Sequence, residues 1–402
     1  MTEIYSHPVS GGSGAGAAGR PPLVVGIDAG GTRSRACLAE GGPGGRVLGR
    51  GTGGPGNALS VGRGDLTRHL AAAVGEALAE AASAPRWRAD GGELRDRVGA
   101  AFGGFAGAAP GAGPERGAEL AVSCLRDALA AHGITGVPVG IGGDTEVALA
   151  AAPGAPADGL VLIAGTGAIA ARLAGGRSAA VSDGHGWLLG DEGSGFWLGN
   201  RAARAALEAL DGRGPWTALV PRVVAHFLGG PAGAGDTAGG EGSPGGGEGS
   251  AGGGEGSAGG GEGSAGGGEG SAGGGEELRR ALAVGPASDP VARHLLGELV
   301  VTRAYAQAPA RLGALSPAVV EEAAGGDAVA RGLLDTAAGL LAATVRSLAP
   351  RPGEPLVVTG GLLGPGGPLL ARVTERLADH GLRVFPVADG SAGAAALARG
   401  LL

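Results

Sequence analysis

Two short segments rich in glycine and threonine follow apolar stretches and are suited to binding phosphate. The first is Asp28-Ala29-Gly30-Gly31-Thr32, and the second is Gly165-Thr166-Gly167. Bare backbone N–H groups in a glycine turn can close on an anion, and a threonine hydroxyl adds a further donor. An aspartate in such a turn can hold Mg²⁺ directly or through water. The residues therefore predict a phosphate site with an associated cation.

Two better-known phosphate loops do not fit these residues. A Walker A loop needs a lysine, and the chain contains none. A Rossmann loop needs GxGxxG at the start of a helix, whereas residues 34–38 alternate polar and apolar side chains as a strand does. A β-hairpin whose turn holds the aspartate, the glycines and the threonine is the remaining option.

A second candidate residue, Asp144, follows an expected strand at 137–141 and the pair Gly142-Gly143. It opens an expected helix at 144–152, so it could cap that helix or act as a general base. We expect the helix N-terminus to keep its carboxylate ionised.

Strands and helices alternate through the rest of the chain, which predicts an α/β fold. In the first half we expect strands at 23–28, 33–39, 46–51, 98–102 and 137–141, and helices at 65–83, with Asp65 as N-cap, 114–131 and 144–152. In the second half we expect strands at 159–164, 168–173, 356–359 and 384–387, and helices within 194–228 and 277–348 and at 367–380 and 391–402.

The segments 24–40 and 161–176 share one plan, a buried strand, a turn rich in glycine and threonine, and a second strand. A repeated hairpin near the start of each half indicates a duplicated α/β domain pair. Chance similarity between two glycine-rich turns is the alternative.

Composition excludes several classes of protein. With 402 residues and 43% hydrophobic side chains, the chain can fill the cores of two domains. The net charge is -7 and the arginines are scattered, so we expect no nucleic-acid partner. The longest nearly apolar stretch, 159–171, is too short to span a membrane, and residues 1–22 do not resemble a signal peptide. We therefore expect a cytoplasmic protein without a membrane partner.

Two segments lack the side chains needed for a core. Residues 1–20 are polar and are expected to form a disordered tail. Residues 229–276 contain 26 of the 91 glycines and a seven-residue repeat marked by glutamate. Because the repeat has no apolar a and d positions, we expect a disordered loop rather than a coiled coil.

Several motifs, taken in order, resemble a known superfamily. DAGGTRSR (28–35) is similar to the first phosphate motif of the actin-like ATPase superfamily of sugar kinases. GGDTEVALAAA (142–152) resembles its connecting motif, LIAGTGAIAA (162–171) its second phosphate motif, and LVVTGGLLGPGGPLL (356–370) its adenosine motif. The chain is most similar to the N-acetylglucosamine kinase branch of the BadF/BadG/BcrA/BcrD ATPase family, where GGPGN (53–57) and GHGWLLGDEGS (184–194) resemble sugar-binding segments.

The resemblance implies a two-domain actin-like ATPase (ribonuclease H-like) fold with an interdomain cleft. Its domains would be 21–143 and 144–402, with the last helix, 391–402, packed back on the N-terminal domain. Roles follow residue by residue. Asp28 would serve Mg²⁺, and the ATP-binding residues would be Gly30, Gly31, Thr32, Gly165, Thr166, Gly167, Gly360 and Gly361. The sugar-binding residues would be Asn57, Asp144, Gly184, His185, Gly186 and Asp191, although contact between His185 and ligand is left open.

The implied activity is an ATP- and Mg²⁺-dependent sugar kinase that transfers the γ-phosphate to a hydroxyl of an amino sugar. N-acetylglucosamine, its O6 and Asp144 as general base are the expected acceptor, hydroxyl and base. A homodimer is left open. One alternative is an ATPase activator of a dehydratase or reductase, but Cys37 and Cys124 are poorly spaced for a shared iron–sulfur cluster. Another is a non-catalytic nucleotide-binding regulator, against which Asp28 and Asp144 count.

Overall fold

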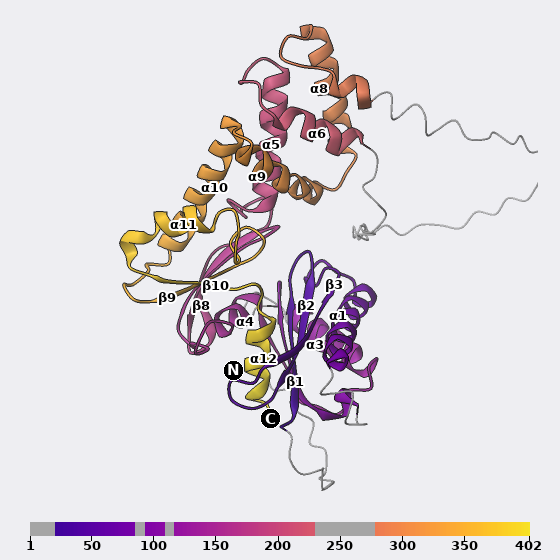
Figure 1. Cartoon of the computed structure of the whole chain (residues 1–402), viewed down its shortest axis with the longest axis vertical. Helices are drawn as coiled ribbons and strands as arrows, with labels where there is room; N and C mark the ends of the chain where they lie inside the picture. The colour runs from indigo at the N-terminus through magenta and orange to yellow at the C-terminus, as the bar shows by residue number, and fades with distance from the viewer. Residues whose placement is uncertain (1–20, 85–92, 109–115, 230–277) are drawn as a thin grey trace, which may run out of the picture.

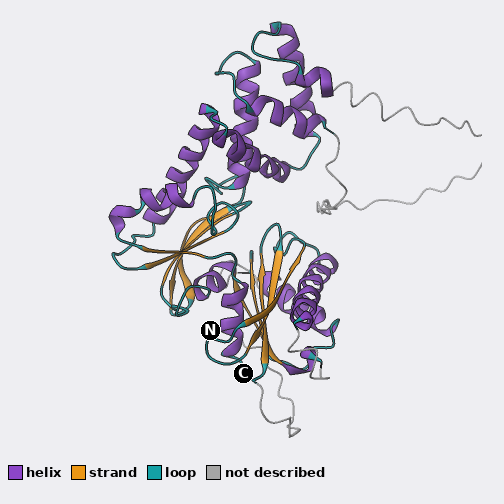
Figure 2. Cartoon of the chain, in the orientation of Figure 1, coloured by secondary structure: helices purple, strands orange, loops and turns teal. Residues whose placement is uncertain are grey.

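The computed structural model describes residues 21–84, 93–108, 116–229 and 278–402. Two α/β halves, each built on one sheet, follow one another along the chain, so the predicted α/β class is confirmed (Figures 1 and 2). The expectations for the tail 1–20 and for the repeat 230–276 lie outside the described residues.

The first sheet has the order β3-β2-β1-β4-β5. The central strand of the hairpin pair, β2, runs antiparallel to its neighbours β1 and β3, whereas β4 and β5 run parallel to β1. Their bounds are Leu23–Ala29 (β1), Ser34–Glu40 (β2), Val47–Gly53 (β3), Val98–Phe105 (β4) and Val139–Gly143 (β5).

The second sheet repeats this plan in the order β10-β9-β6-β7-β8. Here β7 runs antiparallel to its neighbours β6 and β8, and β9 and β10 run parallel to β6. Their bounds are Gly159–Ala164 (β6), Ala168–Ala174 (β7), Arg177–Asp183 (β8), Pro355–Thr359 (β9) and Arg383–Pro386 (β10). The matching order and directions support a duplicated unit. Strand β8 was not predicted from the sequence, because it is an edge strand with exposed residues and little apolar pattern.

Helices cover both faces of the first sheet. On one face lie α1 (Arg63–Ser83) and α3 (Arg116–Ala130), and on the other lie α4 (Asp144–Ala150) and α12 (Ser391–Arg399). Alternate glycines of β3 let α1 approach closely, since a Cβ on Gly51 would lie 2.1 Å from the Ala73 carbonyl oxygen. The expected N-cap of α1 was wrong, because Gly62 occupies that position and Asp65 instead pairs with Arg68.

In the second half, the long expected helical regions are broken into shorter helices. These are α5 (Gly195–Leu210), α6 (Leu219–Leu228), α8 (Pro290–Tyr305), α9 (Ser316–Ala324) and α10 (Ala328–Arg346), with α11 (Leu370–Arg376) after β9. Short 3₁₀ turns lie at Leu94–Arg97, Pro309–Leu315 and Ala378–His380. Helix α10 packs on the second sheet, while α5, α6 and α8 share a separate apolar cluster. Figure 1 shows this helical group at the end of the molecule remote from the first sheet.

Helices α4 and α12 lie between the two sheets. Val147 of α4 packs with α12 and the first sheet, while Ala148 and Leu149 pack against the second sheet. Helix α12 approaches β1 closely, since a Cβ on Gly26 would lie 2.2 Å from the Ser391 carbonyl oxygen. The last described helix therefore completes the core of the first half, as the yellow helix beside the indigo strands shows (Figure 1).

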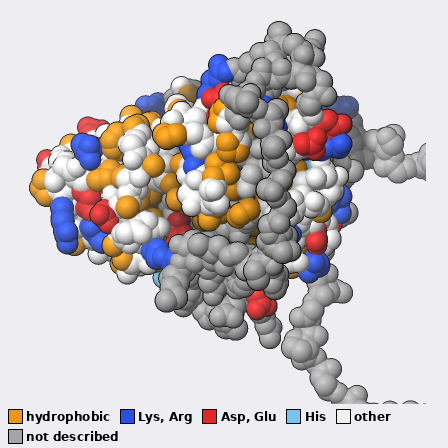
Figure 3. All heavy atoms as spheres, turned by 90° about the horizontal axis from the view of Figure 1, so that it is seen from below, with side chains coloured by type: hydrophobic (Ala, Val, Ile, Leu, Met, Phe, Trp, Pro, Cys, Tyr) orange, Lys and Arg blue, Asp and Glu red, His pale blue; other side chains and the backbone are white. Residues whose placement is uncertain are grey.

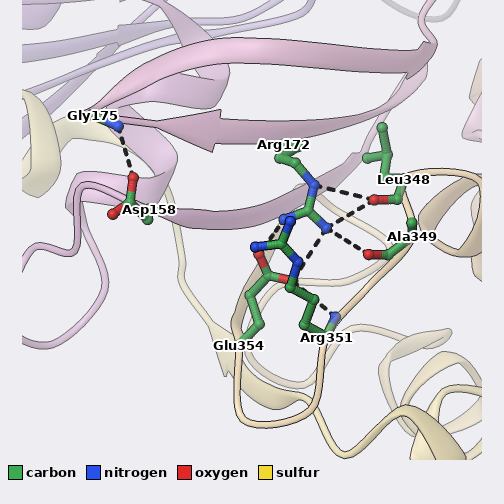
Figure 4. A network of polar contacts seen from close by, with 7 residues as sticks. All are labelled: Asp158, Arg172, Gly175, Leu348, Ala349, Arg351 and Glu354. Atoms are coloured by element: carbon green, nitrogen blue, oxygen red, sulfur yellow. Dashed lines mark hydrogen bonds and ion pairs between the residues drawn. The ribbon is translucent and has the colours of Figure 1, made fainter.

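A half-buried arginine connects three segments of the second half (Figure 4). Arg172 of β7 donates hydrogen bonds to the carbonyl oxygens of Leu348 (2.8 and 3.1 Å) and Ala349 (2.9 Å) and pairs with Glu354. These contacts join β7 to the end of α10 and the start of β9.

One helix of the described chain, α10, is long and apolar enough by length and composition to cross a membrane. Its residues Leu334, Leu341 and Ala342 are buried in the core of the second half, as in a core helix.

On the face shown in Figure 3, basic and acidic side chains are interspersed with hydrophobic ones.

Candidate functional site

The two predicted phosphate turns meet. The Thr32 hydroxyl in the β1–β2 turn and the Thr166 hydroxyl in the β6–β7 turn are hydrogen-bonded to each other, and both side chains are exposed. A Cβ placed on Gly31 or Gly165 would meet no atom within 4 Å, so both turns present open space. Each half thus contributes one glycine turn, and the two turns lie next to each other. Two turns that bind one phosphate chain would need this arrangement.

Backbone hydrogen bonds shape each turn. The Gly30 N–H donates to the Arg33 carbonyl (3.0 Å), and the Gly165 N–H donates to the Gly167 carbonyl (2.9 Å). The start of α5 supports the second turn, because the Gly195 N–H donates to the Gly165 carbonyl (2.8 Å). The N–H groups of Gly30 and Gly165 therefore stabilise the shape of the turns to which they belong.

Asp28 is the second-last residue of β1, just before the first turn, and its side chain is half-buried. Its Oδ2 accepts a hydrogen bond from the Gly390 N–H at 2.8 Å, just before α12. Burial raises the pKa of Asp28 to about 6; the Gly390 hydrogen bond opposes this rise, and the negative charges of Asp144 and Asp389 add to it. Such an environment favours a neutralising cation or proton.

Asp144 is the first residue of α4, and Gly143 is the N-cap. Its Oδ1 accepts a hydrogen bond from the Thr145 N–H at 2.8 Å. Burial raises the pKa of Asp144, which the Thr145 hydrogen bond only partly opposes. The surroundings of this carboxylate thus oppose the ionised form that we expected the helix N-terminus to favour, and its ionisation stays a prediction.

The sheet brings the two aspartates to one edge. The strands β1, β4 and β5 are parallel, and Asp28 is level with Gly104, which is level with Gly142. Carboxyl ends of parallel strands are the usual place for ligands in open α/β sheets. Asp28 and Asp144 lie close enough for the charge of Asp144 to raise the pKa of Asp28.

These residues suit Mg²⁺ bound together with a nucleotide. The described part of the chain holds no group of three or more His, Cys, Asp or Glu able to bind a metal ion on its own. Mg²⁺ often takes one or two protein carboxylates and fills its remaining positions with water and substrate phosphates. Asp28, half-buried and disfavoured as an uncompensated charge, fits that limited role.

Asn57 lies in the connection between β3 and α1. Its Oδ1 accepts a hydrogen bond from the Leu59 N–H at 2.8 Å, so the amide oxygen shapes its own turn. The adjacent Gly56 N–H donates to the Gly30 carbonyl (2.8 Å), and the Ala58 N–H donates to the Ala106 carbonyl (3.1 Å). The segment is therefore attached beside the first phosphate turn, at the edge that carries Asp28.

Asp191 supports the second phosphate turn. Its Oδ1 accepts a hydrogen bond from the Ala168 N–H at 3.1 Å, and a Cβ on Gly167 would lie 2.9 Å from this carboxylate. Burial raises the pKa of Asp191, and the Ala168 hydrogen bond opposes the rise. Of the neighbouring predicted residues, Gly184 (φ +77°) and Gly186 (φ +82°) are in the left-handed region, and His185 is exposed.

The predicted adenosine glycines differ in their surroundings. Gly360 has φ +95°, and a Cβ there would lie 2.3 Å from the Ala164 carbonyl oxygen. Close packing on the end of β6 thus explains this glycine without a nucleotide. Gly361 is exposed, and a Cβ there would meet no atom within 4 Å. Only Gly361 therefore offers open backbone beside the second turn.

Three acidic residues close to the predicted site residues were not predicted from the sequence. Asp389, whose side chain is 11% exposed, precedes the N-cap Gly390 of α12, accepts a hydrogen bond from the Ser391 N–H (2.8 Å) and lies 3.8 Å from Arg50. Its Asp-Gly-Ser sequence before a helix was a readable capping signal. Glu146 lies over Gly142, where a Cβ would be 2.3 Å from its Oε2. The third, Asp183, accepts backbone hydrogen bonds from both ends of the 184–190 loop.

Comparison with known proteins gives a family and a fold. The profile of the BadF/BadG/BcrA/BcrD ATPase family matches residues 25–398. An N-acetylmuramic acid/N-acetylglucosamine kinase of Clostridium acetobutylicum is 46% identical over 77 residues, which span 19% of this chain and only 24% of that kinase.

Two solved structures resemble the whole chain. One, described as an N-acetylglucosamine kinase from Chromobacterium violaceum, has a TM-score of 0.58 at 22% identity, covering 94% of this chain and 99% of that one. The other, of the same description from Porphyromonas gingivalis, has a TM-score of 0.55 at 17% identity, with coverage of 94% and 99%. At these identities the likeness concerns the fold alone, and it supports the predicted α/β fold with two sheet-based halves.

Proposed function

Because the chain belongs to the BadF/BadG/BcrA/BcrD ATPase family, we propose that it is an ATP-dependent kinase of an amino sugar, with N-acetylglucosamine as acceptor and O6 as the phosphorylated hydroxyl. The observation that carries the proposal is the meeting of Thr32 and Thr166 beside the edge that holds Asp28 and Asp144. Phosphoryl transfer to a hydroxyl needs groups that bind the phosphates, a residue that holds Mg²⁺ and a base for the hydroxyl proton. One glycine turn from each half and two carboxylates can supply these groups.

The nucleotide would be held by the two turns. Thr32 and Thr166 would exchange their mutual hydrogen bond for bonds to phosphate oxygens, and the open sides of Gly31 and Gly165 would let the phosphates approach the backbone. Asp28 would hold Mg²⁺, whose chemistry is to neutralise charge on the transferred group. Gly361 would lie under the adenosine.

Asp144 would act as the general base. A sugar hydroxyl is a weak nucleophile, and a positioned carboxylate can take its proton as the phosphoryl group transfers. Burial raises the pKa of Asp144 toward the working pH, which increases its strength as a base. We also propose that residues 21–143 and 144–402 act as two domains, so that their approach would exclude water.

The sugar would be bound by Asn57, Asp144, Asp191 and the backbone of Gly184, His185 and Gly186. The partial match to the Clostridium acetobutylicum kinase supports an amino-sugar acceptor. The alternative of a dehydratase activator has less support. Cys37 is buried and donates to the Ser391 carbonyl, while Cys124 belongs to a different core cluster.

A coupled ADP-release assay tests the proposed function. The acceptors are N-acetylglucosamine, glucosamine, N-acetylmannosamine, N-acetylmuramic acid and glucose, and the position of phosphate in the product is determined by NMR. We expect ADP release to depend on an amino sugar and to be fastest with N-acetylglucosamine. ATP hydrolysis that is as fast without sugar as with it would contradict the proposal. Absorbance near 400 nm from an iron–sulfur cluster would contradict it as well.

The role of Asp144 is tested by Asp144→Asn, which keeps the shape of the side chain but removes the base. We expect kcat to fall by at least about 10²-fold, with ATP affinity nearly unchanged. Asp65, a partly exposed first-turn aspartate of α1 bonded to Arg68, is the matched control, and Asp65→Asn should leave kcat unchanged. Near wild-type turnover of Asp144→Asn would exclude Asp144 as the base.

A further inference from the structure

The loop of residues 184–190 has little apolar support of its own. Leu188 and Leu189 are 72% and 79% exposed, and His185 is exposed as well. Within the loop, the Gly190 N–H donates to the Gly186 carbonyl at 2.8 Å. One ring contact, with centroids of Trp187 and Phe196 5.6 Å apart, connects the loop to α5. Since few buried contacts hold this loop, hydrogen bonds at its ends must determine its position.

One carboxylate joins both ends of the loop. Asp183 Oδ1 accepts hydrogen bonds from the Gly184 N–H (2.8 Å) and the Asp191 N–H (2.7 Å), and Oδ2 accepts one from the Glu192 N–H (2.8 Å). Gly190 leaves room for this carboxylate, since a Cβ there would lie 2.2 Å from Asp183 Oδ1. The residues before and after the loop are thus held by a single side chain.

The backbone at both ends adopts an uncommon conformation. Asp183 has φ +64° and Asp191 has φ +58°, in the left-handed region that few residues other than glycine adopt. Aspartate tolerates this region better than most residues because its short side chain can bond to nearby backbone. At Asp183 those bonds are the ones that close the loop.

The hydrogen bonds continue from this loop to the second phosphate turn. Asp183 holds the N–H of Asp191, and Asp191 in turn holds the N–H of Ala168 at 3.1 Å. A displacement of Asp183 would therefore move the 184–190 loop relative to Thr166 and its turn.

We propose that Asp183 is a positioning residue for sugar binding, which sets the 184–190 loop and Asp191 against the second phosphate turn. This rests on the proposed function, in that the loop and Asp191 are taken to contact the sugar. Asp183 itself acts through its neighbours and need not touch the substrate.

The test compares three variants of the full chain. Asp183→Gly removes the carboxylate without strain, because glycine adopts φ +64° freely. Asp183→Asn keeps the oxygen that can accept from Gly184 and Asp191 but loses the acceptor for Glu192. Asp158→Gly is the matched control, because Asp158 Oδ1 also accepts from a glycine N–H, that of Gly175 at 2.7 Å, in the turn at the other end of β8 (Figure 4).

We expect Asp183→Gly to raise the KM for N-acetylglucosamine by about tenfold or more, with the KM for ATP changed by less than about twofold. Asp183→Asn should give an intermediate KM, and Asp158→Gly should match the wild type. In the protein without ligands, amide hydrogen exchange across 184–192 should be faster in Asp183→Gly and unchanged in Asp158→Gly.

A folded Asp183→Gly protein with an unchanged KM for N-acetylglucosamine, or with unchanged exchange across 184–192, would overturn the inference. If the wild type released no ADP with any sugar, the proposed function would fail separately. The exchange measurement would then still decide whether Asp183 holds the loop.

Discussion

Asp28 combines a poor environment for charge with a place beside the first phosphate turn. Burial raises its pKa to about 6, so the folded protein at neutral pH keeps an ionised group in surroundings that disfavour it. Groups with such perturbed pKa values often mark functional sites. At such sites a protein gives up some folding stability for function.

This arrangement predicts a pH-dependent stability difference for Asp28→Asn. Between about pH 4 and pH 6, Asp28 keeps its proton in the folded chain but has lost it in the unfolded chain. The free energy of unfolding therefore falls as the pH rises through this range. Above about pH 6 the full destabilisation by Asp28 is present. Asparagine removes the cost. We therefore expect Asp28→Asn to be more stable than wild type at pH 7.5 by about 1–2 kcal/mol and equal to it near pH 4. Urea unfolding at both pH values measures the difference.

Asp127→Asn serves as the control for that comparison, because Asp127 is an exposed partner of Arg63. Its effect should be small and should not favour the variant at pH 7.5. A lower stability of Asp28→Asn at pH 7.5 would show that the Gly390 hydrogen bond matters more than desolvation.

At this scale the sequence indicated where candidate site residues lie along the chain, and their roles stay predictions. The motifs around Asp28, Thr32, Asp144 and Thr166 indicated which ends of which strands to consider, and the contact between the two threonines agrees with that reading. The use of individual oxygen atoms could not be predicted. That Asp191 bonds to Ala168, or that Asp183 closes a loop, depends on left-handed backbone angles that the residue type permits but does not require.

Among the elements, α4 links the two halves and carries Asp144 at its start. Its N-cap, Gly143, has no side chain to hold the helix end, and Glu146 replaces it by accepting a hydrogen bond from the Gly143 N–H. The same carboxylate accepts a hydrogen bond from the Ser178 N–H of β8 and faces the charge of Arg177. Glu146 thus connects the start of α4 to an edge strand of the second sheet.

We therefore expect Glu146→Ala to weaken both stability and turnover. Loss of a helix cap usually costs about 0.5–2 kcal/mol, and a looser first turn would misplace Asp144 and lower kcat severalfold, by about 3- to 10-fold. Urea unfolding and steady-state kinetics measure the two effects.

Glu146→Gln separates charge from hydrogen bonding in the same place. Because burial raises the pKa of Glu146, ionisation adds little stability, and glutamine should retain most of it together with most of kcat. If Gln and Ala lowered both quantities equally, the charge of Glu146 rather than its hydrogen bonds would be responsible.

Most strands and helices were predictable, because their apolar periodicity and glycine punctuation were strong. The strand pairs at 23–40 and 159–174 are examples in which both strands and the turn were expected. Strand β8 was not, because an exposed edge strand needs no apolar alternation. The breaks between α5 and α6 and between α9 and α10 were not predicted either, because the residues that end and begin these helices give no clear signal in the sequence. Caps such as Asp327, which bonds to the Ala330 N–H (2.8 Å), define helix ends only once the chain has folded.

For the whole molecule, the repeated sheet order puts equivalent hairpins opposite one another. Each hairpin ends in a threonine turn, and the two turns are in contact through Thr32 and Thr166. The proposed phosphate site is therefore shared equally by the two copies of the unit.

Valine substitutions at these threonines test the sharing. Thr32→Val and Thr166→Val keep the shape of the side chain and remove the hydroxyl, so each should raise the KM for ATP by about 5- to 10-fold. The double variant should raise it by less than the product of the two, because both hydroxyls would act on the same phosphate chain. Fully multiplicative effects in ATP titrations would indicate independent binding positions instead.

The position of α12 also bears on how the protein forms during synthesis. The face of the first sheet that carries Val24, Cys37 and Phe102 is covered by Ala394, Ala395 and Ala398, which leave the ribosome hundreds of residues later. Until then, an apolar surface of the first half stays uncovered, and Asp28 lacks its hydrogen bond from Gly390. The first half therefore cannot reach its final structure as a nascent chain, and a stalled or shortened translation product would offer this surface to chaperones and proteases.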